Sequence, residues 1–157
     1  PLRFAVYFNS LIAEIHKKNM SYKYLEHSTD AFIEVKAKTL EEAFSVAGKS
    51  VVDTIIDLKN IQEIEEKNIN VKGRNLLNLL YNWLEEIVTI TITDGFAIRN
   101  FSVNIKKNKE YQIASKVSGE KLDLKKHNFK VEIKSPTFHL MEINENDEIT
   151  MRYLLDL

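Results

Sequence analysis

Apolar residues recur at steps of three or four in two segments of the chain, and this spacing predicts two amphipathic helices. The first begins after Thr39, with Glu42 at the spacing that lets two side chains cap each other's backbone N–H groups. The second follows Asn75, a typical helix-capping residue, and runs to about Ile90. The apolar positions are Leu40, Ala43, Phe44, Ala47, Val51 and Ile55 in the first helix, and Leu76, Leu80, Trp83, Leu84 and Ile87 in the second.

Between and after these helices the apolar positions alternate with other residues, which predicts several antiparallel strands. One strand is predicted from Phe32 to Val35, shortly after Asp30. Residues 106–110 and 144–148 are polar and predict turns between hairpin partners. Pro136 predicts an edge strand or a bulge, because proline cannot donate to a ladder. The other alternating positions are Ile69, Val71, Phe101, Val103, Ile105, Tyr111, Ile113, Val117, Val131, Ile133, Leu140 and Glu142 beside Met141 and Ile143, and Ile149, Met151, Tyr153 and Leu155.

Together these elements predict an α+β fold, in which an antiparallel or mixed β-sheet carries two main α-helices on one face. The sequence contains no internal repeat, low-complexity tract or linker, so a single domain accounts for it. We expect this domain to span residues 20–157, because Met20 is a plausible start. Residues 1–19 are then an N-terminal extension, either a genuine arm or an addition from expression or upstream translation.

Composition narrows the possible functions. Of 157 residues, 44% are hydrophobic and 29% are charged, as in ordinary soluble proteins. The 22 Lys and Arg residues are balanced by 23 Asp and Glu residues, so we expect no tight unaided binding to nucleic acid. The absence of cysteine excludes thiol catalysis, disulfides and thiolate zinc sites. No apolar run approaches the roughly 20 residues that span a bilayer, so we expect a soluble, cytoplasmic protein.

The remaining candidate chemistry is that of oxygen ligands. The chain has 4 glycines and no phosphate-loop, metalloprotease or dinucleotide motif, so it is not expected to hydrolyse nucleotides alone. Asp30 precedes the first predicted strand, and Asp156 ends the last one just before Leu157. If these strands are neighbours, both carboxylates meet at one end of the sheet and, with a backbone or terminal oxygen, suit Mg²⁺, Ca²⁺ or Mn²⁺. The alternative is a surface carboxylate that accepts hydrogen bonds from turn N–H groups.

Residues 119–143 concentrate positive charge. A solvated lysine face is the simplest interpretation of this segment, and a binding surface is the alternative. The residues concerned are Lys121, Lys125, Lys126, Lys130 and Lys134, together with His127 and His139.

Six blocks, in the same order and spacing, resemble the archease family over residues 22–157. The blocks are EHSTDAFI (26–33), TLEEAF (39–44), LLYNWLEE (79–86), GEKLDLKKH (119–127), VEIKSPTFHLMEI (131–143) and LLDL (154–157). The resemblance implies an accessory protein that activates the GTP-dependent RNA-splicing ligase, which joins tRNA halves. Such a protein promotes guanylylation and multiple turnover of the ligase and is not itself an enzyme.

The resemblance also implies a set of site residues. A divalent metal is expected at Asp30, Asp156 and Leu157, with His27 beside the metal or turned toward the partner. The chain departs from the family pattern at two positions, where Phe32 replaces a usual glycine and Pro136 a usual aliphatic residue. The implied functional surface consists of Glu120, Lys126, His127, Glu132, Lys134 and Thr137.

Two other functions are compatible with the sequence. One is a general chaperone or stabilising partner that has no part in ligase chemistry. The other is a metal-dependent hydrolase that uses Asp30 and His27, although the sequence shows no accompanying nucleophile and general base. The sequence leaves the identity of the metal and the oligomeric state open.

Overall fold

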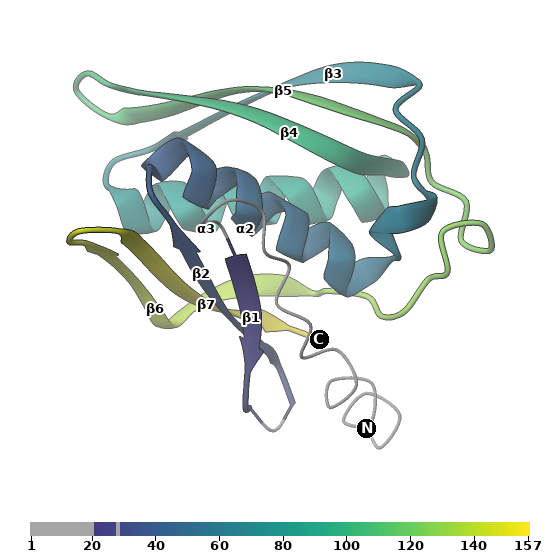
Figure 1. Ribbon diagram of the computed structural model, residues 1–157, viewed down its shortest axis with the longest axis horizontal. Coiled ribbons are helices and arrows are strands. Elements are labelled where there is room, and N and C mark those ends of the chain that lie inside the picture. Colours follow the sequence, from purple (N-terminus) through teal and green to yellow (C-terminus); the bar gives the residue numbers. More distant parts are fainter. Residues whose placement is uncertain (1–20, 28) are drawn as a thin grey trace.

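Two antiparallel sheets lie on either side of a pair of helices (Figure 1). This computed structural model describes residues 21–27 and 29–157, so the predicted extension at residues 1–19 lies outside the described residues. In chain order the elements are β1 (Ser21–Leu25), β2 (Ala31–Ala37), α2 (Leu40–Ile55), η1 (Leu58–Asn60), β3 (Glu65–Gly73), α3 (Leu76–Val88), η2 (Thr89–Thr93), β4 (Phe96–Lys107), β5 (Tyr111–Lys121), β6 (Ser135–Glu145) and β7 (Ile149–Asp156).

The predicted α+β fold with two main helices is confirmed, but the strands divide between two sheets. The four-stranded sheet has the order β1-β2-β7-β6, and the three-stranded sheet has the order β3-β5-β4. Both helices contact strands of both sheets. The physical reason is the breadth of their apolar surfaces, because α2 buries residues on most of its sides between Ala43 and Ile55. A helix that is apolar over so wide an arc requires cover from more than one layer.

Both helices begin where the sequence predicts. The Thr39 side chain accepts a hydrogen bond from the Glu42 N–H at 3.2 Å, and Asn75 accepts one from the Asn78 N–H at 2.8 Å. In the first cap, the Glu42 carboxylate accepts a hydrogen bond from the Lys38 N–H at 3.3 Å. In a regular capping box the donor would be the N–H of Thr39, one residue later. After α3, the chain continues as the π-helical turn η2 before β4 begins.

Two strand predictions need correction. β1 was not predicted, although Tyr22 and Tyr24 pair with Val35 and Ile33 of β2. The strand predicted around Val131 and Ile133 does not form, and β6 begins only at Ser135. The reason is the length of β7: its last residue, Asp156, pairs with Ser135, so residues before Ser135 have no strand beside them.

The predicted turns and the prediction for Pro136 are confirmed. Residues 108–110 join β4 to β5, and residues 146–148 join β6 to β7. Pro136 lies on β6, which is an edge strand, and the pairing of β6 with β7 slips immediately after the next residue, Thr137. Proline is tolerated here because an edge strand leaves one row of N–H positions unused.

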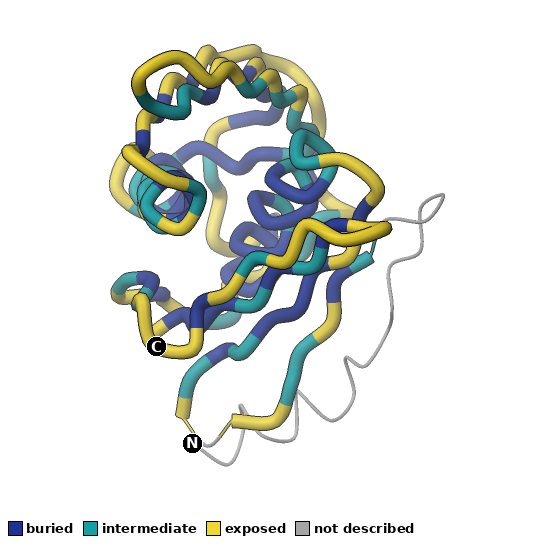
Figure 2. Tube along the Cα trace, turned by 90° about the vertical axis from the view of Figure 1, so that its left-hand side faces the viewer, coloured by how far each residue is buried: buried dark blue, intermediate teal, exposed yellow. Residues whose placement is uncertain are grey.

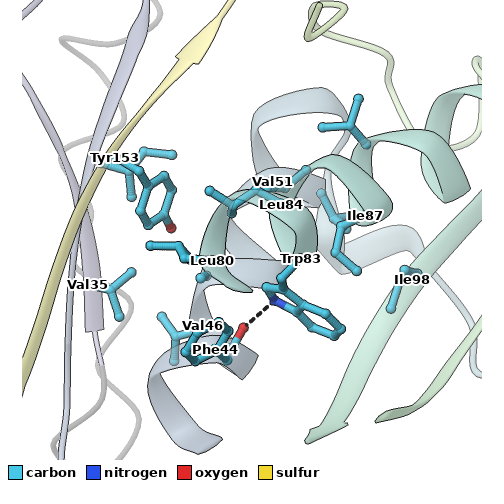
Figure 3. Packing of buried hydrophobic residues seen from close by; sticks show 14 of the residues in the cluster. Val35, Phe44, Val46, Val51, Leu80, Trp83, Leu84, Ile87, Ile98 and Tyr153 are labelled. Atoms are coloured by element: carbon cyan, nitrogen blue, oxygen red, sulfur yellow. Dashed lines mark hydrogen bonds between the residues drawn. The ribbon is translucent and has the colours of Figure 1, made fainter. Parts of the chain in front are cut away.

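The apolar core lies between the two sheets and includes buried residues of both α2 and α3. Figure 3 shows Trp83 of α3 next to Phe44 of α2, with Val35 and Tyr153 on the four-stranded side and Ile98 on the three-stranded side. Trp83 is fully buried, and its indole N–H donates to the Phe44 carbonyl oxygen at 2.8 Å. Within the described residues, neither helix combines the length and apolarity needed to cross a bilayer.

Candidate functional site

The two aspartates singled out in the sequence lie at the same end of neighbouring strands. β2 and β7 are antiparallel partners, and Ala31 pairs with Leu155. Extending this register by one residue sets Asp30 opposite Asp156, and side chains in opposite positions share one face of a sheet. Asp156 is exposed, and so are Glu26, His27 and Thr29 in the segment that joins β1 to β2; Figure 2 marks the C-terminal end of the chain, close to Asp156, with C. The condition for the predicted metal site, that the first and last predicted strands be neighbours, is therefore met.

This acidic pair lies on the outer face of the four-stranded sheet, away from the helices. Successive residues of a strand point to opposite faces. Ala31, Ile33 and Val35 are fully buried against the helices, so Asp30 and Phe32 belong to the other face. His27 accompanies them there, with its Nδ1 atom 3.6 Å from a carboxylate oxygen of Asp30 and its ring edge-on to Phe32.

A neighbouring carboxylate on the same face is already neutralised. Glu34 accepts a hydrogen bond from Arg152 at 2.7 Å, and the Lys23 ammonium lies 3.2 Å from its other oxygen. Burial alone would raise the pKa of Glu34, but these two cations outweigh it and hold the pKa below its ordinary value. Asp30 differs from Glu34 because the group beside it is a histidine.

The acidic pair fits an open metal site rather than a closed one. Two carboxylates placed opposite each other repel, and a hard divalent cation between them would remove that repulsion. Among the residues that the structure describes, no group of three or more His, Asp or Glu side chains is placed to hold a metal. A cation bound by Asp30 and Asp156 would therefore take its other ligands from water, from backbone oxygens such as those of Leu157, or from a partner.

A second cluster joins the end of β5 to the loop at residues 122–134. Glu120 is 7% exposed and His127 is fully buried. The Asp123 N–H donates to Nδ1 of His127 at 3.0 Å, which leaves the proton on Nε2 to be donated to Glu120 at 2.7 Å. The same Glu120 oxygen lies 2.7 Å from the Lys126 ammonium. The cluster thus holds Lys126 over the carboxylate while its side chain remains 42% exposed.

The protonation of Glu120 provides a direct test of this cluster. Hydrogen bonds from Lys126 and His127 lower the pKa of Glu120 to about 2, against a smaller opposing effect of burial. Because the folded-state pKa lies below the ordinary value of 4.5, the ionised carboxylate stabilises the fold above pH 4.5, and this contribution is lost as the pH falls toward 2. An NMR titration of the side-chain carboxyl carbon is expected to show a midpoint near 2.

Lys126→Met should raise that midpoint, because it removes the main hydrogen bond to the carboxylate. Lys125→Met is the matched control: Lys125 is exposed, and its backbone N–H rather than its side chain contacts Asp123. It should leave the midpoint unchanged. A wild-type midpoint near 4.5 would show that the cluster does not form in solution.

The remaining members of the implied surface lie along the path from this loop to the acidic pair. Glu132 and Lys134 are exposed, and the Lys134 N–H donates to the Asp156 carbonyl oxygen at 2.8 Å. Thr137 pairs with Leu154 on β7, and its hydroxyl accepts a hydrogen bond from the His139 N–H at 3.1 Å. Strand pairing therefore places Lys134 and Thr137 beside the end of β7 that carries Asp156. Glu120, Lys126 and His127 form a separate cluster.

A buried ionic network that supports this loop was missed in the sequence. Lys130 belongs to the predicted lysine face, yet its side chain is only 9% exposed. Its ammonium lies 3.2 Å from Asp57 and 3.6 Å from Asp53, and it donates to the Asp53 carbonyl oxygen. The Tyr22 hydroxyl donates to the Asp53 carboxylate at 2.7 Å. No local signal identifies this network, because its members come from β1, from the end of α2 and from a loop far along the chain.

These features define a class of protein: a small α+β domain with two sheets around two helices, an acidic sheet end and no phosphate-binding glycine loop. The Archease protein family matches residues 22–157, and the protein belongs to this family. Protein archease of Pyrococcus abyssi is 37% identical over 125 residues, which cover 79% of this chain and 88% of the relative. Protein archease of Pyrobaculum islandicum is 34% identical over 143 residues, 89% of this chain and 97% of the relative.

The fold is also found in a solved structure. The solution structure of Methanobacterium thermoautotrophicum protein 1598 matches with a TM-score of 0.72 and 27% identity, covering 87% of this chain and 98% of that chain. The family resemblance drawn from the six sequence blocks is thereby confirmed.

Proposed function

We propose that the protein is an accessory factor of the GTP-dependent RNA-splicing ligase, and that it promotes guanylylation and repeated turnover of that enzyme. The observation that carries the proposal is membership of the archease family over residues 22–157. The formal net charge of −1 supports a factor that binds a protein rather than RNA, since RNA binding relies on clustered cations. The protein itself would then catalyse no step.

The acidic pair is the part of the surface that we assign to this role. Asp30 and Asp156, with oxygen atoms of Leu157, would hold a divalent cation such as Ca²⁺, Mg²⁺ or Mn²⁺. When bound, such a cation supplies positive charge, which stabilises the charge that develops on a phosphate during transfer. His27 would help to orient Asp30, because its Nδ1 atom lies 3.6 Å from the carboxylate while its ring packs edge-on against Phe32.

The Glu120 cluster and the start of β6 complete the proposed contact surface. Lys126 is held by Glu120 and yet is accessible, so it can meet an anionic group of the ligase without searching many rotamers. Lys134 and Thr137 lie next to the end of β7 that carries Asp156, and with the exposed Glu132 they would contact the ligase beside the cation.

The test is a single-turnover guanylylation assay of the cognate ligase with GTP and Mn²⁺, with and without the protein. We expect faster formation of the ligase–guanylate adduct and more than one round of RNA joining per ligase. If the wild-type protein leaves both quantities unchanged but suppresses aggregation of unrelated proteins, the chaperone function is correct instead. Metal-dependent cleavage of a phosphoester by the isolated protein would support the hydrolase alternative.

A further inference from the structure

The pairing of β6 with β7 contains an unusually large bulge. Thr137 pairs with Leu154, and Glu142 pairs with Arg152. Residues 138–141 of β6 therefore lie opposite the single residue Tyr153 of β7. Bulges of this kind interrupt the ladder and turn side chains in new directions, and they occur often at sheet edges and near functional sites.

The bulge presents apolar side chains to solvent. Phe138 is 53% exposed and Leu140 is 50% exposed. Met141, the next residue along β6, is only 9% exposed. Leu140 has a φ of 58°, a left-handed conformation that residues other than Gly, Asn and Asp rarely adopt. The burial of Met141 accounts for an inward turn at that residue, but no packing benefit accounts for a half-exposed leucine in a strained conformation.

Helix α3 extends this apolar surface. The Tyr81 ring stacks on Phe138 with centroids 4.3 Å apart and planes 11° apart. Leu77, one turn earlier on the same side of α3, is 40% exposed. We call Leu77, Tyr81, Phe138, His139 and Leu140 the apolar strip. The strip follows α3 and β6, which lie in contact (Figure 1).

We propose that the apolar strip anchors the protein in an apolar pocket on the surface of the ligase. This inference rests on the proposed function and adds the contact that holds the two proteins together. The first argument is continuity: Ser135, at the start of β6, pairs with Asp156, so the strand that carries the strip also borders the acidic pair. The acidic pair faces away from the helices, whereas the strip lies beside α3, so a partner that covers both extends along β6 and around this edge strand.

The chemistry of the strip selects the kind of partner. None of its five residues is Lys or Arg, so it offers no permanent cation to a phosphate backbone. The bulge also removes the regular ladder that a second copy of the chain would need for edge-to-edge pairing through β6. With nucleic acid and a second copy of the chain disfavoured, the expected binding site on the ligase is an uncharged pocket that accepts two or three apolar side chains of the strip.

The size of the strip fits an anchor within a larger interface. A stable interface buries about 800 Å² on each partner, and a few central side chains supply most of the affinity. The half-exposed side chains of the strip make up only part of such an area, and the acidic pair and the start of β6 would supply the rest.

Leu140→Asn separates docking from a structural role. Asparagine tolerates the left-handed conformation, so the thermal unfolding midpoint should stay the same or rise. Affinity for the cognate ligase, measured by isothermal titration calorimetry, should fall about tenfold or more. Phe138→Ala should weaken binding as well. Ile64→Asn is the matched control, because Ile64 is a 67% exposed aliphatic residue on the loop before β3, and it should bind as wild type does.

The outcomes distinguish this inference from the function on which it rests. If Leu140→Asn and Phe138→Ala bind and activate the ligase as wild type does, the strip is not the anchor, although the proposed function stands. Equal weakening by Ile64→Asn would also overturn the anchor. A wild-type protein that neither binds nor activates the ligase removes both proposals. A wild-type dimer in sedimentation that Leu140→Asn dissociates would make a second copy the occupant and overturn the proposal.

Discussion

Replacing both Asp30 and Asp156 by asparagine is expected to abolish the acceleration of ligase guanylylation while leaving the fold intact. Asparagine keeps the shape of the side chain but removes the negative charge that a hard cation requires. Outer-shell changes alone cost about 10–100-fold in metal affinity, so the loss of both proposed ligands should cost at least that much. Calorimetric titration with Mn²⁺ measures the loss of affinity, and single-turnover guanylylation measures its consequence.

The control for this double variant is Asp147→Asn with Glu148→Gln. These two acidic residues are exposed in the turn between β6 and β7, away from the acidic pair, and their replacement makes the same change in net charge. The control should bind Mn²⁺ and activate the ligase as wild type does. Full activation by the Asp30/Asp156 variant, with its metal affinity lost, would separate the metal from the activity and refute the assigned role of the acidic pair.

Trp83→Ala is expected to lower the free energy of unfolding by about 3–5 kcal/mol, the usual cost of truncating a buried aromatic residue. Trp83 is fully buried between α2 and the three-stranded sheet, where its ring meets Phe101 edge-on. The substitution also leaves the Phe44 carbonyl oxygen without the indole N–H that now donates to it. Typical domains have only about 5–15 kcal/mol of stability, so the variant should be marginal. Urea unfolding followed by circular dichroism provides the measurement.

Two companion variants resolve the contributions at Trp83. Trp83→Phe retains most of the apolar volume but loses the donor, so it should cost about 1–3 kcal/mol. Leu77→Ala, on the same helix but 40% exposed, should cost less than about 1 kcal/mol. A Trp83→Ala variant no less stable than Leu77→Ala would contradict the packing of α3 between the two sheets.

The candidate site could be predicted only in part from the sequence. Asp30 and Asp156 could be proposed because each stands at the end of a strongly alternating segment, and their meeting required only that those segments be neighbours. Glu120 and His127 were identified through the family resemblance, but their mutual hydrogen bond depends on how the loop after β5 folds back. A solvated face was the simplest interpretation for Lys130, because sequence periodicity cannot reveal that Asp53 of α2 and Asp57 just after it lie beside its ammonium.

Local interactions along the chain account for both helices, their caps at Thr39 and Asn75, and most strands, because hydrophobic periodicity and capping act over a few neighbouring residues. The division of the strands into two sheets, the bulge after Thr137 and the buried ion pairs of Lys130 depend on contacts between residues far apart in sequence. Such contacts decide which strands find partners, as the late start of β6 opposite Asp156 shows. They also decide which polar groups are buried, because burial depends on the layers that close over a residue rather than on its neighbours in the chain.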